Sequence, residues 1–232
     1  MTAVADMRQI EGQELDRAAL DALIAAAPGV PAHLIDCDLT AAEMGGMALE
    51  GWVFERCALR GARLDGARLS GARFQSCRAG GLSAVGADLS RGRILGCDLS
   101  NAVLRRADLA DCRIERTKLS GADLTDLRTL ELDMEEVVLA YARLPGLSFR
   151  RLRLIRIDLS EADIRKCDFR EAVFVDSSLR NAFREGARFD GADLRGADLS
   201  GLTLADARGL RGAIIAREQA ADLLGELGLR VI

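Results

Sequence analysis

Large apolar residues recur at every fifth position of this chain, from Leu39 to Ile214. Of the 36 positions on this ladder, 31 carry Leu, Ile, Met or Phe. The exceptions are Ala79, Ala84, Thr129, Arg184 and Gly209. Neither a helix nor a hairpin gives a period of five over such a length, so the pattern predicts a repeat architecture in one elongated body.

A second ladder, mostly Ala and Cys, lies two positions before each large residue. It holds all six cysteines, at Cys37, Cys57, Cys77, Cys97, Cys112 and Cys167. The first four recur at every fourth step of this ladder, and the large ladder shows the same spacing at Phe149, Phe169 and Phe189. These spacings favour a four-sided coil of four repeats. Because coils about 4.8 Å apart hold stacked Cβ atoms too far apart for a disulfide and place sulfurs in a line, we expect packed, reduced thiols.

Both ends of the chain depart from the repeat. Residues 1–36 are predicted to be an N-terminal cap, in which Asp16 caps a short helix with Leu20 on its apolar face. Residues 37–215 are the repeat body. Residues 216–232 are predicted to form a helix and an apolar tail that cover the last coil or pair two chains. The candidate dimer contacts are Leu223, Leu224, Leu227, Leu229 and Val231.

Two parts of the repeat body are irregular. Between residues 126 and 157 the small ladder holds large residues such as Leu132 and Val137, which predicts a wider slot, a bulge, a loop or a contact surface. At Arg184 a charged residue occupies an inward position, where burial is costly. We expect a local bulge there that turns Phe183 inward and Arg184 outward.

The units GADLS, GCDLS, GADLR and GADLT resemble the pentapeptide-repeat family. The resemblance covers about three quarters of the chain, and its phase never slips. It implies an all-β solenoid, a right-handed quadrilateral β-helix with short capping helices at both ends. Nine such coils would make a rod of roughly 40 Å. Known members include dimeric rods that protect DNA gyrase from quinolones and are held to imitate duplex DNA, so the resemblance implies gyrase as a partner and the C-terminal helix as a dimer element.

Catalytic chemistry finds no support in the sequence. His33 is the single histidine and has no partner evident from the sequence, and the recurring Asp of the repeats is explained by a structural role. No phosphate-binding glycine motif stands between a strand and a helix. We therefore expect no enzyme activity, no catalytic residues, no cofactor and no metal. There is also no apolar run long enough for a membrane span and no secretory signal, so we expect a cytoplasmic protein.

The charge pattern argues against mimicry of DNA along the whole rod. A duplex of ~40 Å carries roughly 24 phosphates, whereas this chain has a net charge of −4. Acidic and basic residues that flank the large ladder nearly balance on each of the four expected faces. The balance excludes an acidic face, and because it excludes a basic face as well, we expect no direct binding of nucleic acid.

Binding to another protein is the function that remains. Ile155 and Val175 are expected to stack outward on adjacent coils beside Val173, and the expected rim consists of Arg153, Arg156 and Arg195. Exposed apolar residues rimmed by arginine are typical of an interface, although scattered surface aliphatics would look the same. A gyrase-protecting role is the specific hypothesis, and a general interaction scaffold without a topoisomerase role is the alternative.

Overall fold

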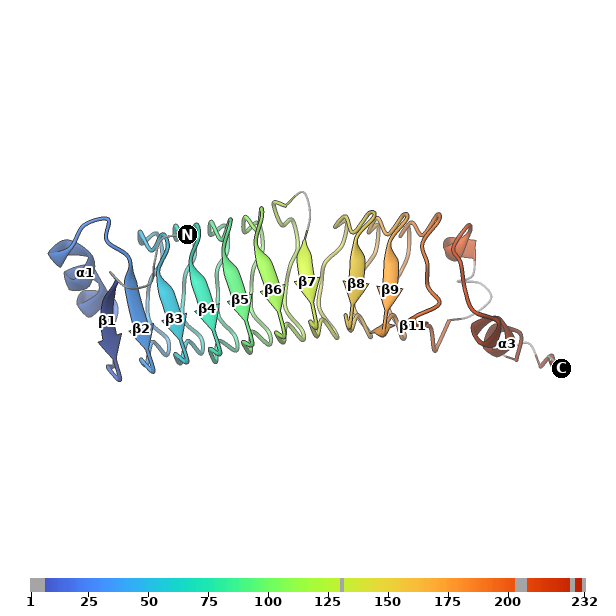
Figure 1. Ribbon diagram of the computed structural model, residues 1–232, viewed down its shortest axis with the longest axis horizontal. Coiled ribbons are helices and arrows are strands. Elements are labelled where there is room, and N and C mark those ends of the chain that lie inside the picture. The colour runs from blue at the N-terminus through green and yellow to red at the C-terminus, as the bar shows by residue number, and fades with distance from the viewer. Residues whose placement is uncertain (1–6, 130–131, 203–207, 226–227, 231–232) are drawn as a thin grey trace.

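The protein is a rod-shaped parallel β-solenoid, with one helix at each end (Figure 1). The computed structural model describes residues 7–129, 132–202, 208–225 and 228–230. One wall of the rod is a parallel sheet whose strands follow one another in chain order. Its strands are β1 (Arg8–Glu11), β2 (Ala32–Ile35), β3 (Val53–Glu55), β4 (Arg73–Gln75), β5 (Arg93–Leu95), β6 (Arg113–Glu115), β7 (Asp133–Glu135), β8 (Arg153–Ile155) and β9 (Val173–Val175).

Each coil has four sides, with one repeat to a side. Phe54 pairs with Phe74, and Ile94 pairs with Ile114, so that equivalent residues of adjacent coils stack directly. The other walls keep the same offset in single bridges and in a short pair of strands, β10 (Ser177–Ser178) and β11 (Ala197–Asp198). Within the described coils a backbone of positive φ recurs at almost every fifth residue and marks the corners. The predicted four-sided β-helix is confirmed.

Both residue ladders face the interior through Leu194, but the phase of five slips before Ile214, which pairs with Asp193 at an offset of 21 residues instead of 20 and is 50% exposed, while Leu210 is buried. Leu99, Leu119 and Leu159 are buried, and the small residues two positions earlier are buried with them. Phe149, Phe169 and Phe189 stack ring on ring, with centroids 5.0 Å apart at each step. Full burial of one such large side chain stabilises the fold by about 1.5–3 kcal/mol. The interior is therefore a continuous apolar column that runs along the rod.

The aspartate of the ADL units holds the turn that follows it. In coil after coil its Oδ1 accepts a hydrogen bond from the backbone N–H two residues later, as Asp98 does from Ser100 at 3.0 Å and Asp158 from Ser160 at 2.9 Å. This local bond is the usual reason for aspartate at the start of a turn. The recurring aspartates therefore have the structural role that the sequence predicts.

Helix α1 (Arg17–Ala26) closes the N-terminal end. The Asp16 side chain accepts a hydrogen bond from the Ala19 N–H at 2.8 Å, and Leu20 is fully buried, as expected. Arg17 donates to the carbonyl oxygens of Glu43 and Gly45 at 3.3 and 3.1 Å, and thereby satisfies acceptors at the open edge of a coil. Segment 1–36 is more than a helical cap, because β1 and β2 within it extend the parallel sheet.

The C-terminal end carries the 3-10 helix η2 (Arg208–Leu210) and helix α3 (Arg217–Gly225). Gln219 ties α3 to the rod. Its side-chain oxygen accepts from the Ala216 N–H at 2.6 Å, and its amide nitrogen donates to the Leu194 and Ala197 carbonyls at 2.8 and 2.7 Å. The bond between Ala216 and Gln219 is one half of a capping box. The same Gln219 side chain also covers the last coil.

Segment 126–157 keeps the phase of the repeat in its described residues, but its strand ladder is weaker. Between β7 and β8 the described ladder consists of the single pair Glu135 and Ile155, whereas β8 and β9 pair at three positions. Figure 1 shows a wider gap between these two strands than between their neighbours. Leu132 and Val137 are buried in the small slots.

The expected bulge at Arg184 is wrong. Phe183 donates its N–H to the Ala162 carbonyl and accepts from the Ile164 N–H, so the regular phase continues through it. The side chain of Phe183 therefore points outward and is 58% exposed. Arg184 is half-buried, and its guanidinium donates to the Leu179 carbonyl at 3.3 Å. Backbone bonds to the neighbouring coil outweigh the preferences of two side chains.

Candidate protein-binding wall

The outward side chains of β8 and β9 form a small apolar patch. Ile155 pairs with Val175, and Arg153 pairs with Val173, which confirms that the two aliphatic residues stack on adjacent coils. Ile155, Val173 and Val175 are all partly exposed. Parallel strands hold such neighbours about 4.8 Å apart, so the methyl groups form one continuous surface.

Ion pairs surround this patch. Arg156 contacts Glu135 at 3.2 Å and Glu136 at 2.6 Å. Arg195 donates a bidentate pair of hydrogen bonds to the Asp193 carboxylate, from Nε at 2.9 Å and from Nη2 at 2.6 Å. These hydrogen bonds lower the pKa of Asp193. Apolar centre and polar rim together match the anatomy of a small protein interface. The role of these residues as contacts stays a prediction.

The C-terminal candidates lie at the edge of the rod. Leu223 packs partly against the core, whereas Leu224 is 38% exposed and Leu229 is 55% exposed. Leu227 and Val231 lie outside the described residues. Helix α3 has no buried residue among those described, so its apolar side chains are only partly covered by this chain.

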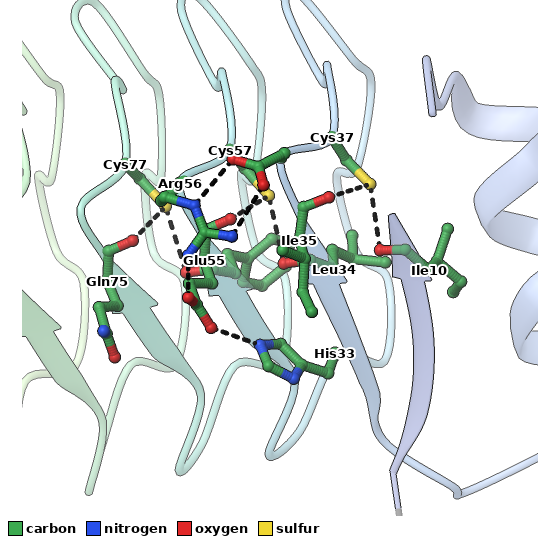
Figure 2. A network of polar contacts seen from close by, with 12 residues as sticks. Ile10, His33, Leu34, Ile35, Cys37, Glu55, Arg56, Cys57, Gln75 and Cys77 are labelled. Carbon is green, nitrogen blue, oxygen red and sulfur yellow. Dashed lines mark hydrogen bonds and ion pairs between the residues drawn. The ribbon is translucent and has the colours of Figure 1, made fainter. Parts of the chain in front are cut away.

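His33 has a partner that the sequence reading missed. Its Nε2 lies 2.9 Å from Glu55 Oε2, on the next strand, and Glu55 also contacts Arg56 (Figure 2). Arg56 in turn donates to both carboxylate oxygens of Asp36, at 2.9 and 2.7 Å, and this lowers the pKa of Asp36. The His33 side chain is buried, and its Nδ1 has no hydrogen-bond partner in the described part of the chain. The repeat register could have predicted this contact. Val53 lies directly opposite His33 on the next coil, and Glu55 lies two residues after Val53.

The cysteines are buried and free, as expected. Their thiols are also hydrogen-bond donors: Cys57 Sγ donates to the Leu34 carbonyl at 3.4 Å (Figure 2). Cys77 Sγ donates to the Phe54 carbonyl at 3.2 Å. Farther along the column Ser177 donates in the same way to the Leu154 carbonyl, whereas Thr117 donates to the Glu115 carbonyl of its own coil. Burial raises the pKa of the Cys112 thiol to about 12. The Cys112 thiol is therefore protonated and unreactive at neutral pH.

No group of His, Cys, Asp or Glu suited to hold a metal ion occurs in residues 7–129, 132–202, 208–225 and 228–230. The helices in these same ranges are too short and too polar to cross a membrane.

Comparison with known protein families matches pentapeptide repeats in eight copies, at residues 53–91, 96–126, 133–170, 153–196 and 172–208. The chain belongs to the pentapeptide-repeat family. No curated protein matches its sequence. The repeats explain the period of five and the buried ladders, but they leave the outer side chains free to vary.

Several solved structures are similar in fold. HetL, a protein involved in heterocyst differentiation regulation from the cyanobacterium Nostoc sp. strain PCC 7120, is 22% identical with a TM-score of 0.65 over 82% of this chain and 86% of HetL. Full-length QnrB1, a plasmid-mediated fluoroquinolone resistance protein, is 20% identical with a TM-score of 0.61 over 96% of this chain and 98% of QnrB1. At such identity the likeness extends to the fold alone.

Proposed function

We propose that this pentapeptide-repeat protein has no catalytic activity and acts by binding another protein on its strand-bearing wall. The observation that carries the proposal is the stacked pair Ile155 and Val175, partly exposed beside Val173 and ringed by arginines. Arginine and apolar residues are favoured at interface centres, whereas lone surface aliphatics need no explanation. Because Ile155 and Val175 stack in register, they form a continuous patch and are not lone surface aliphatics.

DNA gyrase is the specific partner that we propose. QnrB1 is described as a fluoroquinolone resistance protein and shares this rod over nearly its full length. The experiment is a gyrase supercoiling assay with and without a quinolone. We expect added protein to restore supercoiling in the presence of the drug, or to inhibit it in the absence of the drug. No effect at micromolar protein would exclude the topoisomerase role and favour a general interaction scaffold.

Val175→Arg tests the patch itself. The side chain points outward, so we expect the variant to fold, as seen by circular dichroism, and to lose its effect on gyrase. Val103→Arg is the matched control, because Val103 is also partly exposed and pairs with Ser83 on another wall of the rod. Equal losses in the two variants would contradict the assignment of the patch.

The same proposal includes a twofold dimer through the C-terminal end. Ile214 is 50% exposed on the last coil, beside a helix that buries none of its described residues. A second copy of this chain would cover these side chains. Sedimentation should give a dimer for the native protein and a monomer for Leu224→Glu. A native monomer at high concentration would overturn this part of the proposal.

A further inference from the structure

Three arginines stand in one column on the strand wall. Arg73 pairs in register with Arg93, and Arg93 pairs with Arg113, on the adjacent strands β4, β5 and β6. All three are exposed. Stacked strands place their side chains about 4.8 Å apart, so three positive charges line up over about 10 Å. The net charge of the whole wall conceals this column, because the acidic residues Asp133 and Asp193 follow the arginines farther along the same wall.

Two of these charges have no counter-ion among the described residues. Within those ranges, neither Arg73 nor Arg93 makes a side-chain hydrogen bond or an ion pair. Arg113 differs, since its Nε lies 2.6 Å from Glu115 and 3.7 Å from Asp133. Like charges directly opposite on neighbouring strands destabilise a sheet. An arrangement that lowers the stability of the fold, and that no other interaction within the protein offsets, is expected at functional sites.

The surroundings of the column are suited to a ligand. Residues 70–76 and 90–96 contain no acidic residue but supply a further charge, Arg91, whose Nη2 donates to Ser70 Oγ at 2.7 Å. On the neighbouring outward column Gln75 pairs with Leu95, which is partly exposed. The patch therefore offers guanidinium donors together with one apolar contact, and arginine is enriched at protein interfaces.

The limits of the patch define its ligand. Val53 precedes the column and Asp133 ends it, while Glu55 and Glu115 lie on the adjacent outward column. A long polyanion such as duplex nucleic acid would extend over these carboxylates. A short acidic segment of a protein, with two or three carboxylates, fits within the limits and pairs with the free guanidiniums.

We propose that Arg73, Arg93 and Arg113 form a binding site for an acidic segment of a partner protein. The site rests on the proposed function in one respect, that the wall binds protein, and it adds the charge of the partner. Arg73 and Arg93 bind the carboxylates directly. Leu95 contacts the apolar side chains between them.

The probe is a fluorescein-labelled eight-residue peptide of alternating Glu and Leu, titrated by fluorescence anisotropy in 50 mM and 200 mM NaCl. We expect Arg73→Gln combined with Arg93→Gln to weaken binding at least tenfold in 50 mM salt. The matched control combines Arg60→Gln with Arg106→Gln, which removes from other walls two exposed arginines that form no ion pair within the described residues. The control should change affinity less than twofold. Equal weakening in both double variants, or no binding to the native protein, would overturn the site.

Two further measurements separate the alternatives. The melting temperature of the Arg73, Arg93 double variant should equal or exceed that of the native protein, because a repulsion is removed, and a clear decrease would show a structural role instead. A 20-base-pair DNA duplex should bind more weakly than the peptide. Tighter binding of the duplex, lost in the same variant, would overturn the choice of protein. Peptide binding without any effect on gyrase supports this site and excludes only the topoisomerase partner.

Discussion

The two ends of the rod are closed in different ways. At the N-terminal end, α1 inserts Leu20 completely into the core and hydrogen-bonds the coil edge through Arg17. At the C-terminal end, α3 buries none of its described side chains and is held by the amide of Gln219. The N-terminal end is sealed by apolar burial, whereas the C-terminal end is held by hydrogen bonds and leaves apolar side chains exposed.

Truncation of Leu20 is the most damaging change that this comparison predicts. Leu20→Ala removes a fully buried side chain from the cap, and such changes cost about 2–5 kcal/mol. Leu224→Ala is the counterpart at the other end, and we expect it to change the unfolding free energy of the monomer by less than about 0.5 kcal/mol. Urea denaturation measures both. Similar losses would mean that both ends are sealed alike.

Loss of the capping hydrogen bonds should show the opposite asymmetry. Gln219→Ala frees two carbonyl groups that are partly buried, and each unsatisfied group costs about 1–3 kcal/mol. Arg17→Ala frees two exposed carbonyls to which water can bind, so we expect a loss below about 0.5 kcal/mol. Hydrogen exchange should show α3 opening in the first variant. Protection of α3 equal to that of the native protein would contradict the role of Gln219.

Acid should destabilise the coils that hold arginine-bound carboxylates, among them those toward the C-terminal end. Hydrogen bonds from Arg170 lower the pKa of Asp168 to about 2, and Arg165 and Arg195 lower the pKa values of Asp163 and Asp193. A depressed carboxyl pKa stabilises the fold above its unfolded value near 4, and this contribution is lost as the pH falls toward 2. Denaturation between pH 5 and pH 2 should show the loss.

Arg170→Gln is the control for the acid effect. Without its guanidinium, Asp168 should titrate closer to its ordinary value, so the variant should lose less stability between pH 4 and pH 2 than the native protein. Because exposed ion pairs contribute little, the difference should be the smallest of those predicted here. A pH profile parallel to that of the native protein would contradict this account of Asp168.

The interior could be predicted from the sequence, because a register of five leaves each inward residue one possible neighbour. The same register placed Ile155 beside Val175 on the outer wall. The register also holds at Phe183 and Arg184, and the predicted bulge was wrong because the cost of burying a charge was given more weight than the backbone bonds to the adjacent coil. The contact between His33 and Glu55 and the arginine column at Arg73 become visible only when equivalent positions on adjacent coils are compared. The total charge of a wall conceals both features.

The central claim is that four repeats make one coil and that the coils stack along a straight axis. Thr40, Ser120 and Ser200 occupy the same place on coils that are four apart, so spin labels on cysteines introduced there report the axial rise by electron–electron double resonance. We predict roughly 19 Å between positions 40 and 120, and twice that, roughly 38 Å, between 40 and 200, from a rise of about 4.8 Å per coil. Distances that fail to double over the second interval would contradict the solenoid.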